Sequence, residues 1–372
     1  MGGPLRIGVV GAGAISAQYS ATLLGLPQLR LTAVADLNGE RAKALAARHP
    51  GARVLSLDRL LRADDVDLVL NLTTPAGHAG IAQAALAAGK HVYSEKPLAT
   101  SMADAEAMLS VAAAAERRLG CAPDTVLGTG VATARAAVDD GLIGVPHAAT
   151  AFMVTPGHER WHPDPEFYYR PGGGPLLDMG PYYVTALVHL LGPVRRVLGA
   201  SSRPRAQRVI GQGPRAGMTF DATIDTHLTG VLEHESGALT TLMMSFDTWA
   251  GRLPRIEVYG RDGSLSVPDP NTFAGDIEIW TAAEPAWRVL PVAAGYAGAG
   301  RGIGIADLAA AIGEHRPHRA GAELALHVLD VMLCLQQAAD SGTAVRVGTS
   351  CRRPDPVPGV IPTSPVVVPP GP

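Results

Sequence analysis

Short apolar runs alternate with alanine-rich helical patterns through the first 122 residues, and this alternation limits the possible folds most strongly. Strands are predicted at Leu5–Val10, Leu29–Ala35, Val66–Leu72 and His91–Ser94, and a helical pattern follows each of them. Runs that are apolar throughout are typical of strands buried on both faces, and strands that alternate with helices pair in parallel. The sequence therefore predicts an N-terminal α/β domain with a doubly wound parallel sheet.

The pattern changes after residue 122, where longer runs alternate every second residue. Thr223–Glu233 and Ala238–Phe246 are examples, and a short turn at 235–237 joins them. Such alternation is typical of antiparallel strands with one buried face. We therefore expect residues 1–122 to form the first domain and 123–350 to form an α+β domain with a mostly antiparallel open sheet. We expect 351–372 to be a proline-rich extended tail outside the fold, because proline disfavours helices and interior strands.

The composition excludes several classes of protein. Apolar residues make up 47% of the 372 residues and charged residues 17%, which argues against global disorder. A net charge of −3 gives no basic face for nucleic acid or a membrane surface. We expect no signal peptide and no membrane span, since no apolar run approaches about 18 residues. The three cysteines form no metal-binding or CxxC spacing, so we predict reduced thiols in a cytoplasmic protein.

The segment GAGAIS at 11–16 follows the first predicted strand and opens the first predicted helix. Gly11 allows the tight turn, and Gly13 lets the backbone approach a pyrophosphate at the helix N-terminus, next to Ala14 and Ile15. Ser16 stands where a third glycine is common, and it is still small. In this context the segment predicts a dinucleotide-binding site of Rossmann type.

Asp36 lies at the end of the second predicted strand, 25 residues after Gly11. Its carboxylate can accept hydrogen bonds from two ribose hydroxyls and would repel a 2′-phosphate, which favours NAD over NADP. Arg41 is also expected at the nucleotide, where it could weaken that discrimination. The alternative for Asp36 is an N-cap of the following helix.

Four segments of the sequence together resemble the motifs of a known protein family. They are GAGAIS at 11–16, TPAGH at 74–78, EKP at 95–97 and GGGPLLDMG at 172–180. In this order, the chain resembles the Gfo/Idh/MocA family of glucose–fructose oxidoreductase, inositol dehydrogenase and rhizopine-catabolism proteins over roughly residues 5–350. The resemblance implies an NAD-dependent oxidoreductase. It also implies cofactor contacts for Thr73, Thr74, Pro75, His78, Glu95, Lys96 and Pro97.

Lys96 follows the predicted strand His91–Ser94, at the sheet edge where such folds bind ligands. The resemblance implies that its ammonium hydrogen-bonds the reacting substrate oxygen, where it would stabilise a developing alkoxide. Only Lys43, Lys90 and Lys96 among 31 basic residues are lysine, and arginine could not take over this proton chemistry at position 96. The alternative is a surface lysine in a turn.

Asp178 matches the carboxylate that the family carries in its second domain. Tyr182 follows it by one helical turn, where many members have histidine and a branch of the family has tyrosine. The resemblance thus implies that Tyr182 is the acid/base and that Asp178 orients the substrate or Lys96. Two alternatives remain: Tyr182 only shapes the pocket, or the neighbouring Tyr183 contributes.

A polar and aromatic loop precedes this predicted helix and suits a sugar ring. The residues that we expect at the substrate are His158, Trp161, Tyr168, Arg170, Asp178, Tyr182, Tyr183 and Lys96. His158 and His162 have a spacing that suggests metal, but adjacent prolines disfavour a helix and no third ligand is evident, so we predict no metal site. His327 could line the same pocket or belong to the core.

These observations predict hydride transfer between a nicotinamide and a secondary alcohol of a sugar, cyclitol or glycoside. One alternative is a redox-neutral, NAD-dependent enzyme that cleaves a glycoside through a transient keto-sugar. Another is a non-catalytic dinucleotide-binding regulator. Because the antiparallel sheet is expected to keep apolar residues on its outer face, we also predict a homodimer or homotetramer formed through that sheet.

Overall fold

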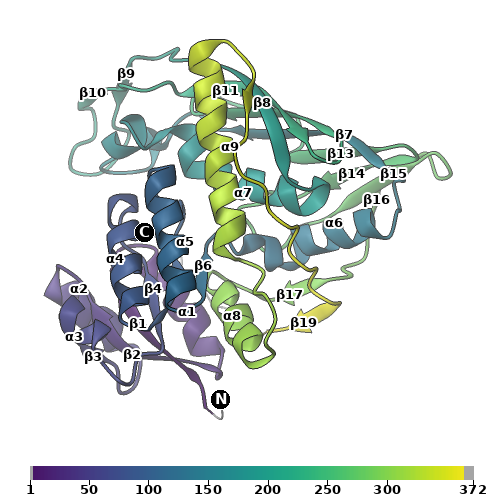
Figure 1. Cartoon of the computed structure of the whole chain (residues 1–372). Helices are drawn as coiled ribbons and strands as arrows, with labels where there is room; N and C mark the ends of the chain where they lie inside the picture. The colour runs from purple at the N-terminus through teal and green to yellow at the C-terminus, as the bar shows by residue number, and fades with distance from the viewer. Residues whose placement is uncertain (1–2, 364–372) are drawn as a thin grey trace. The chain divides into compact units, whose positions relative to one another are not determined.

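The computed structural model describes residues 3–363, and within them the chain divides into two compact units (Figure 1). Among these residues, unit 1 comprises 3–129, 294–326 and 354–363, and unit 2 comprises Gly130–Ala293 and His327–Arg353. The chain thus returns to unit 1 twice after leaving it. The predicted boundary at residue 122 lies seven residues before the observed one at 129 and includes neither return.

Unit 1 contains a six-stranded parallel sheet in the order β3-β2-β1-β4-β5-β6. Its central strands are buried because helices cover both faces of such a sheet. The chain order reverses beside β1, which lies between β2 and β4, and sheets of this kind bind ligands at that position. The strands are β1 (Leu5–Val10), β2 (Leu29–Ala35), β3 (Arg53–Val54), β4 (Leu68–Asn71), β5 (His91–Ser94) and β6 (Leu119–Cys121).

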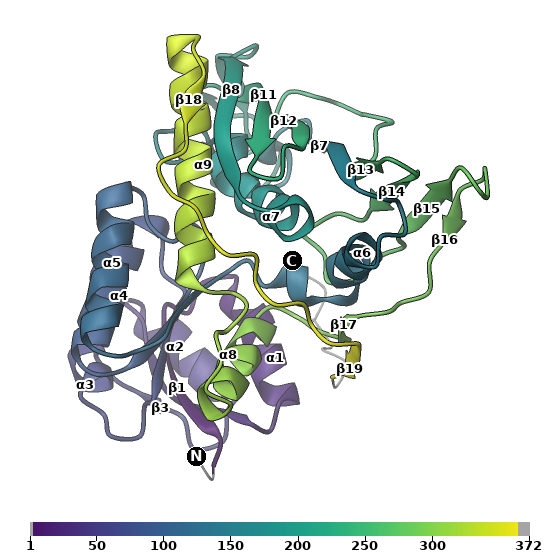
Figure 2. The same cartoon turned by 45° about the vertical axis from the view of Figure 1, so that its right-hand side comes forward.

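Polar side chains cap three of the helices of unit 1. The side chain of Asn38 accepts hydrogen bonds from the backbone N–H groups of Glu40 and Arg41, and Ser101 caps α5. Helices α4 and α5 lie side by side in both views (Figures 1 and 2). The helices are α1 (Ser16–Gly25), α2 (Gly39–Ala46), α3 (Leu57–Leu61), α4 (Pro75–Ala87), α5 (Met102–Ala114) and α8 (Ile303–Gly313), with a 3₁₀ turn, η1, at Thr125–Leu127.

The first part of the proline-rich tail belongs to the fold, contrary to our prediction. β19 (Val360–Pro362) pairs in parallel with β17 (Gly295–Ala297), and Val357 is buried. The Arg319 side chain also donates hydrogen bonds to the carbonyl oxygens of Asp355 and Pro356. Proline is compatible with this position because the strand pair has only two members and needs few backbone donors. The remainder of the predicted tail, 364–372, lies outside the described residues.

Unit 2 contains a nine-stranded sheet in the order β16-β15-β14-β13-β7-β12-β11-β8-β18. Only the pair β7 and β12 is parallel, so the predicted mostly antiparallel sheet is confirmed. Its strands are β7 (Pro146–Val154), β8 (Val194–Ser202), β11 (His227–His234), β12 (Leu239–Ser245), β13 (Ile256–Gly260), β14 (Gly263–Val267), β15 (Glu278–Thr281), β16 (Arg288–Val289) and β18 (Val345–Arg346). The short strands β9 (Gln207–Val209) and β10 (Thr219–Asp221) form a separate hairpin.

Helix α7 (Gly174–Leu191) packs against β7, β11 and β12 and covers the buried face of this sheet. Thr240, Leu242 and Met244 of β12 are fully buried on that face, while Leu239 on the other face is 49% exposed. Helix α6 (Thr129–Asp139) leads into the unit. Burial thus alternates along most of β12, as expected for a strand with one face against the core.

Helix α9 (Ala322–Ser341) begins in unit 1 and continues in unit 2 from His327. Among residues 3–363 it is the one helix long and apolar enough to cross a membrane by length and composition, although it has no uninterrupted apolar run. In this structure 61% of its apolar window is buried, which is typical of a core helix.

Candidate active site

The glycine turn of unit 1 has the geometry of a phosphate-binding loop. Gly11 has φ +96°, and a Cβ atom there would lie 2.7 Å from the carbonyl oxygen of Leu72, so only glycine fits. A Cβ atom on Gly13 would meet no atom within 4 Å, which leaves the backbone open to a ligand. Helix α1 then starts next to Ala14 and Ile15, and no side chain caps its N-terminus. A pyrophosphate fits such an end because it supplies the missing acceptor.

Asp36 joins this turn to the end of β2. Its Oδ2 accepts the Ala12 N–H at 2.6 Å, and its Oδ1 accepts the Asn38 N–H at 2.6 Å. The alternative prediction that Asp36 caps α2 is wrong, because Asn38 performs that function. Arg41 lies exposed in the first turn of α2, and Leu37 is fully exposed immediately after Asp36. The sequence analysis did not select Leu37, and an exposed apolar side chain next to Asp36 suits contact with a flat base.

His78 has a different position from the one that we expected. Its ring is fully buried, with Nδ1 2.7 Å from the carbonyl oxygen of Pro97 and Nε2 3.0 Å from that of Thr73. The ring therefore connects the segment after β4 to the segment after β5 and presents no atom to a ligand. Asn71, which sequence reasoning missed, supports the same segment by donating to the His78 carbonyl at 3.1 Å. Thr74 and Pro75, at the exposed start of α4, remain candidates for cofactor contact.

Glu95 holds the backbone of Lys96 at the carboxyl end of β5. Its Oε2 accepts the Lys96 N–H at 2.8 Å, and its Oε1 accepts the Tyr19 hydroxyl at 2.8 Å. Burial beside Glu95 raises the pKa of Tyr19 well above its usual value, so the phenol stays a donor. The Lys96–Pro97 peptide bond is cis, and Lys96 is half-buried. Lys96 thus lies at the sheet edge that the sequence indicated.

Asp124 is a buried acid of unit 1 that sequence reasoning did not select. Its Oδ2 accepts the backbone N–H groups of Gly302 and Gly304 at 2.8 and 2.9 Å, at the start of α8. Burial raises the pKa of this carboxyl to about 6. No local pattern indicates this contact, because the two partners are more than 170 residues apart in sequence.

In unit 2, Asp178 and Tyr182 lie one turn apart on α7, as the spacing predicted. Gly174 starts this helix with φ +91°, and a Cβ atom on Gly173 would lie 2.5 Å from the Phe167 carbonyl oxygen. The glycine run is thus needed where the loop turns into the helix. Asp178 Oδ2 lies 2.9 Å from His158 Nε2, a pair that the sequence did not indicate.

The predicted substrate loop contains both buried and exposed aromatic residues. The ring of His158 is buried, and its centroid lies 4.3 Å from that of Phe246 and 4.7 Å from that of Tyr168. Trp161 is half exposed and Arg170 is exposed, so these two can contact a ligand.

Tyr183 is fully buried beside Asp269 and Arg255, which makes it a core residue rather than the substrate contact that we predicted. His327 is also a core residue, since its Nε2 accepts the Val194 N–H at 3.0 Å. Both positions follow from packing that helical periodicity alone does not resolve. Within residues 3–363 no group of three or more His, Cys, Asp or Glu side chains is arranged to hold a metal ion.

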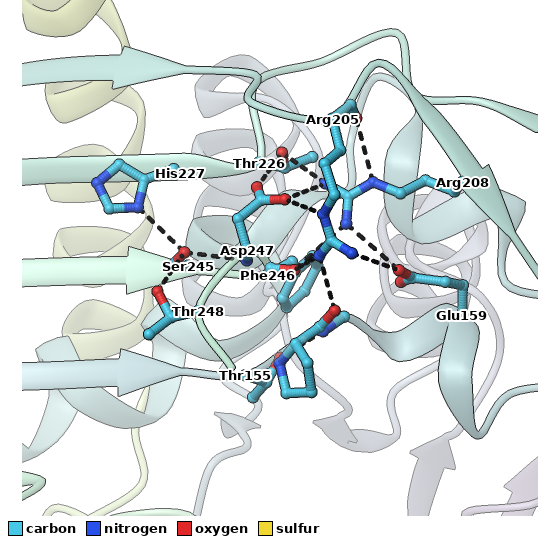
Figure 3. A network of polar contacts seen from close by, with 12 residues as sticks. Thr155, Glu159, Arg205, Arg208, Thr226, His227, Ser245, Phe246, Asp247 and Thr248 are labelled. Atoms are coloured by element: carbon cyan, nitrogen blue, oxygen red, sulfur yellow. Dashed lines mark hydrogen bonds and ion pairs between the residues drawn. The ribbon is translucent and has the colours of Figure 1, made fainter. Parts of the chain in front are cut away.

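A largely buried ionic network includes Glu159 of this loop (Figure 3). The Arg208 guanidinium, only 1% exposed, donates to Asp247 Oδ1 at 2.8 Å and to Glu159 Oε1 at 3.4 Å. Arg205 also donates to Asp247 at 2.9 Å, and the Thr226 hydroxyl donates to its other oxygen at 2.5 Å. Two arginines thus balance two carboxylates. The Arg205 side chain is partly exposed, and the pairing makes the burial of the other three charges, on Arg208, Glu159 and Asp247, tolerable.

A Rossmann sheet with a glycine turn, an acid at the end of β2 and a lysine at the end of β5 defines a dinucleotide-dependent oxidoreductase. Comparison with known protein families gives the same class of protein. Residues 5–122 match the oxidoreductase family with an NAD-binding Rossmann fold, and residues 131–266 match the Gfo/Idh/MocA C-terminal domain. The chain belongs to the Gfo/Idh/MocA family of oxidoreductases, and the predictions of that family and of NAD as its cofactor are confirmed.

Curated relatives include sugar and cyclitol enzymes. The chain is 32% identical to dTDP-3,4-didehydro-2,6-dideoxy-alpha-D-glucose 3-reductase of Streptomyces violaceoruber, over 70% of this chain and 79% of the relative. It is 28% identical to myo-inositol 2-dehydrogenase of Thermotoga maritima, over 70% of this chain and 74% of the relative.

Solved structures share the fold. An oxidoreductase domain protein from Kribbella flavida superposes with a TM-score of 0.77 at 24% identity, over 93% of this chain and 99% of that one. Aldose-aldose oxidoreductase from Caulobacter crescentus superposes with a TM-score of 0.76 at 22% identity, over 92% and 99%.

Proposed function

We propose that this oxidoreductase interconverts a secondary alcohol and the corresponding ketone on a sugar, cyclitol or glycoside, with NAD as the redox partner. The observation that carries the proposal is Lys96, whose backbone Glu95 holds at the carboxyl end of β5. The names of the curated relatives, a keto-sugar reductase and an inositol dehydrogenase, support the substrate class.

The residues of this chain then have separate tasks. The glycine turn and Asp36 would hold NAD, which supplies the hydride acceptor when bound. Lys96 hydrogen-bonds the reacting oxygen and stabilises negative charge that develops on it. Tyr182, in its phenolate form, receives the hydroxyl proton, and Asp178 orients the substrate. Trp161 and Tyr168 offer apolar faces on which a sugar ring can stack.

A substrate panel tests this function directly. Purified protein is mixed with NAD and with inositols, free sugars or glycosides, and NADH absorbance is followed; keto-sugars, free and dTDP-linked, are assayed with NADH in the reverse direction. NADH formation or consumption that depends on one of these compounds supports the proposal. Glycoside cleavage without net NADH indicates the redox-neutral alternative. NAD binding with no reaction on the whole panel contradicts the proposed activity.

We further propose that the enzyme is a homodimer or homotetramer formed through the outer face of the nine-stranded sheet. Adjacent strands bring Leu198 opposite Val231, and Met243 opposite Phe152, on that face. Leu198 is 40% exposed and Leu239 is 49% exposed, and apolar side chains of this kind gain from burial in an interface. Light scattering after size exclusion should give a mass of two or four times 38.5 kDa for the native protein. The Leu198→Glu variant should give a smaller mass. A monomeric native protein would contradict this proposal.

We place the enzyme in the cytoplasm, since Cys121 and Cys334 are buried thiols outside any disulfide. Fractionation of the producing cells tests this location, and recovery of the protein outside the cytoplasm would contradict it.

A further inference from the structure

The imidazole of His158 meets the carboxylate of Asp178 in unit 2. Nε2 of the ring lies 2.9 Å from Oδ2 of Asp178, and the two side chains are 10% and 17% exposed. His158 belongs to the 3₁₀ turn η2 (His158–Arg160), and Asp178 lies 20 residues later on α7. A hydrogen bond to a carboxylate that is mostly shielded from water is stronger than one at an exposed site.

The surroundings of the ring determine which nitrogen carries the proton. Nδ1 of His158 is buried and makes no hydrogen bond. A buried N–H without an acceptor is costly, whereas a lone pair in the same place is less so. Because Nε2 faces an acceptor oxygen, the hydrogen atom belongs on Nε2. The ring therefore donates to Asp178 from its Nε2–H tautomer.

The loop holds this ring in place on several sides. Ring centroids of Phe246, Tyr168 and Trp161 lie 4.3, 4.7 and 5.1 Å from that of His158. The backbone N–H of His158 donates to the Tyr169 hydroxyl at 3.0 Å, and that hydroxyl donates to Glu159.

Glu159 in turn belongs to the buried network with Arg205 and Arg208 (Figure 3). The donor is thus fixed before any ligand arrives, which is the condition for precise orientation of its partner.

We propose that His158 is a positioning residue for the reaction: its Nε2–H fixes one oxygen of Asp178 and so sets the orientation in which that carboxylate meets the substrate. This inference rests on the proposed function, in which Asp178 orients the substrate. It changes our expectation for His158, from direct substrate contact to action through Asp178. Tyr182, one turn further along α7, depends on the same orientation because it acts on the same substrate.

Two variants separate the hydrogen bond from packing. His158→Phe keeps a flat ring but removes the donor, and His158→Gln can place an amide N–H near the position of Nε2. We expect His158→Phe to lower kcat about tenfold to a hundredfold, with an unchanged Kd for NAD. His158→Gln should stay within about fivefold of the wild type. His147→Gln is the matched control, since His147 is an exposed histidine of the same unit, on β7.

A spectroscopic measurement detects the hydrogen bond between His158 and Asp178 without enzyme turnover. ¹⁵N NMR of histidine-labelled protein, assigned with His158→Gln, should show His158 as the Nε2–H tautomer, and Asp178→Asn should shift its signals. An Nδ1–H tautomer, or a His158→Phe variant within twofold of the wild-type kcat, overturns the inference. So does a His158→Gln variant as impaired as His158→Phe. A wild type that turns over no panel substrate refutes the proposed function, while the tautomer still tests the pairing.

Discussion

The Glu95 carboxylate holds the backbone of Lys96 with one oxygen and the Tyr19 hydroxyl with the other, each at 2.8 Å. Both partners are donors, so both carboxylate oxygens must be acceptors. This arrangement fixes the start of the Lys96 side chain at the end of β5 and explains how one lysine can be oriented at a strand end.

Glu95→Gln should therefore impair catalysis through Lys96. Glutamine offers only one acceptor oxygen. Either the Lys96 N–H then faces an amide NH₂ and loses its acceptor, or the Tyr19 hydroxyl must turn to accept from that NH₂. We expect kcat to fall about tenfold. Tyr19→Phe removes one donor and leaves the Lys96 contact, so its effect should be smaller. Equal kcat values for Glu95→Gln and the wild type would refute the role of this carboxylate.

Gly11 and Gly13 should respond differently to alanine. Gly11→Ala forces a Cβ atom to within 2.7 Å of the Leu72 carbonyl oxygen at a φ of +96°, so the free energy of unfolding should fall by about 1–3 kcal/mol. Gly13→Ala meets open space and should leave stability unchanged.

The same alanine at position 13 projects toward the space that the pyrophosphate needs, so the Kd for NAD should rise at least tenfold. Thermal melts with and without NAD separate the two effects. A Gly13→Ala variant that binds NAD normally would show that the cofactor does not approach this glycine.

Asp124 should make stability depend on pH in an unusual direction for an acid. Its pKa is raised to about 6 in the folded protein by burial, against about 3.9 in an unfolded chain. The folded state therefore holds the proton more tightly, and this contribution is fully present below pH 4 and is lost as the pH rises through 6.

Asp124→Asn removes that titration. The wild type should lose on the order of 3 kcal/mol of unfolding free energy relative to Asp124→Asn between pH 4 and 7. Urea unfolding of both proteins at each pH provides the comparison. The difference in unfolding free energy between the two proteins removes the contribution of other titrating groups, such as His91 and His234. Parallel pH profiles for the two proteins would mean that Asp124 titrates normally.

Local sequence patterns predicted the strands and helix pairs that depend only on residues close together in the sequence. β2 and β5 have the predicted bounds, Leu29–Ala35 and His91–Ser94, because continuous apolar runs define buried strands. The pair Asp178 and Tyr182 follows in the same way from helical spacing. β3, at Arg53–Val54, is too short to leave a periodic signal.

Contacts between distant segments were not predictable from local patterns. The proline-rich segment at 360–362 becomes a strand only because β17 lies beside it. His158 lies next to Asp178 because an irregular loop follows that path. His78 is buried because its two ring nitrogens lie at hydrogen-bond distance from two backbone carbonyl groups. Spacing rules describe neighbours on one helix or strand, whereas tertiary packing decides these pairs.

The measurement that tests the central claim most directly is turnover by Lys96→Met on the substrate found with the panel, together with its affinity for NAD. Methionine keeps much of the side-chain bulk but has no ammonium group to stabilise or relay charge on the reacting oxygen. We predict an unchanged Kd for NAD and a kcat lowered by about 10²–10⁴. A Lys96→Met enzyme with near-normal kcat would contradict the account.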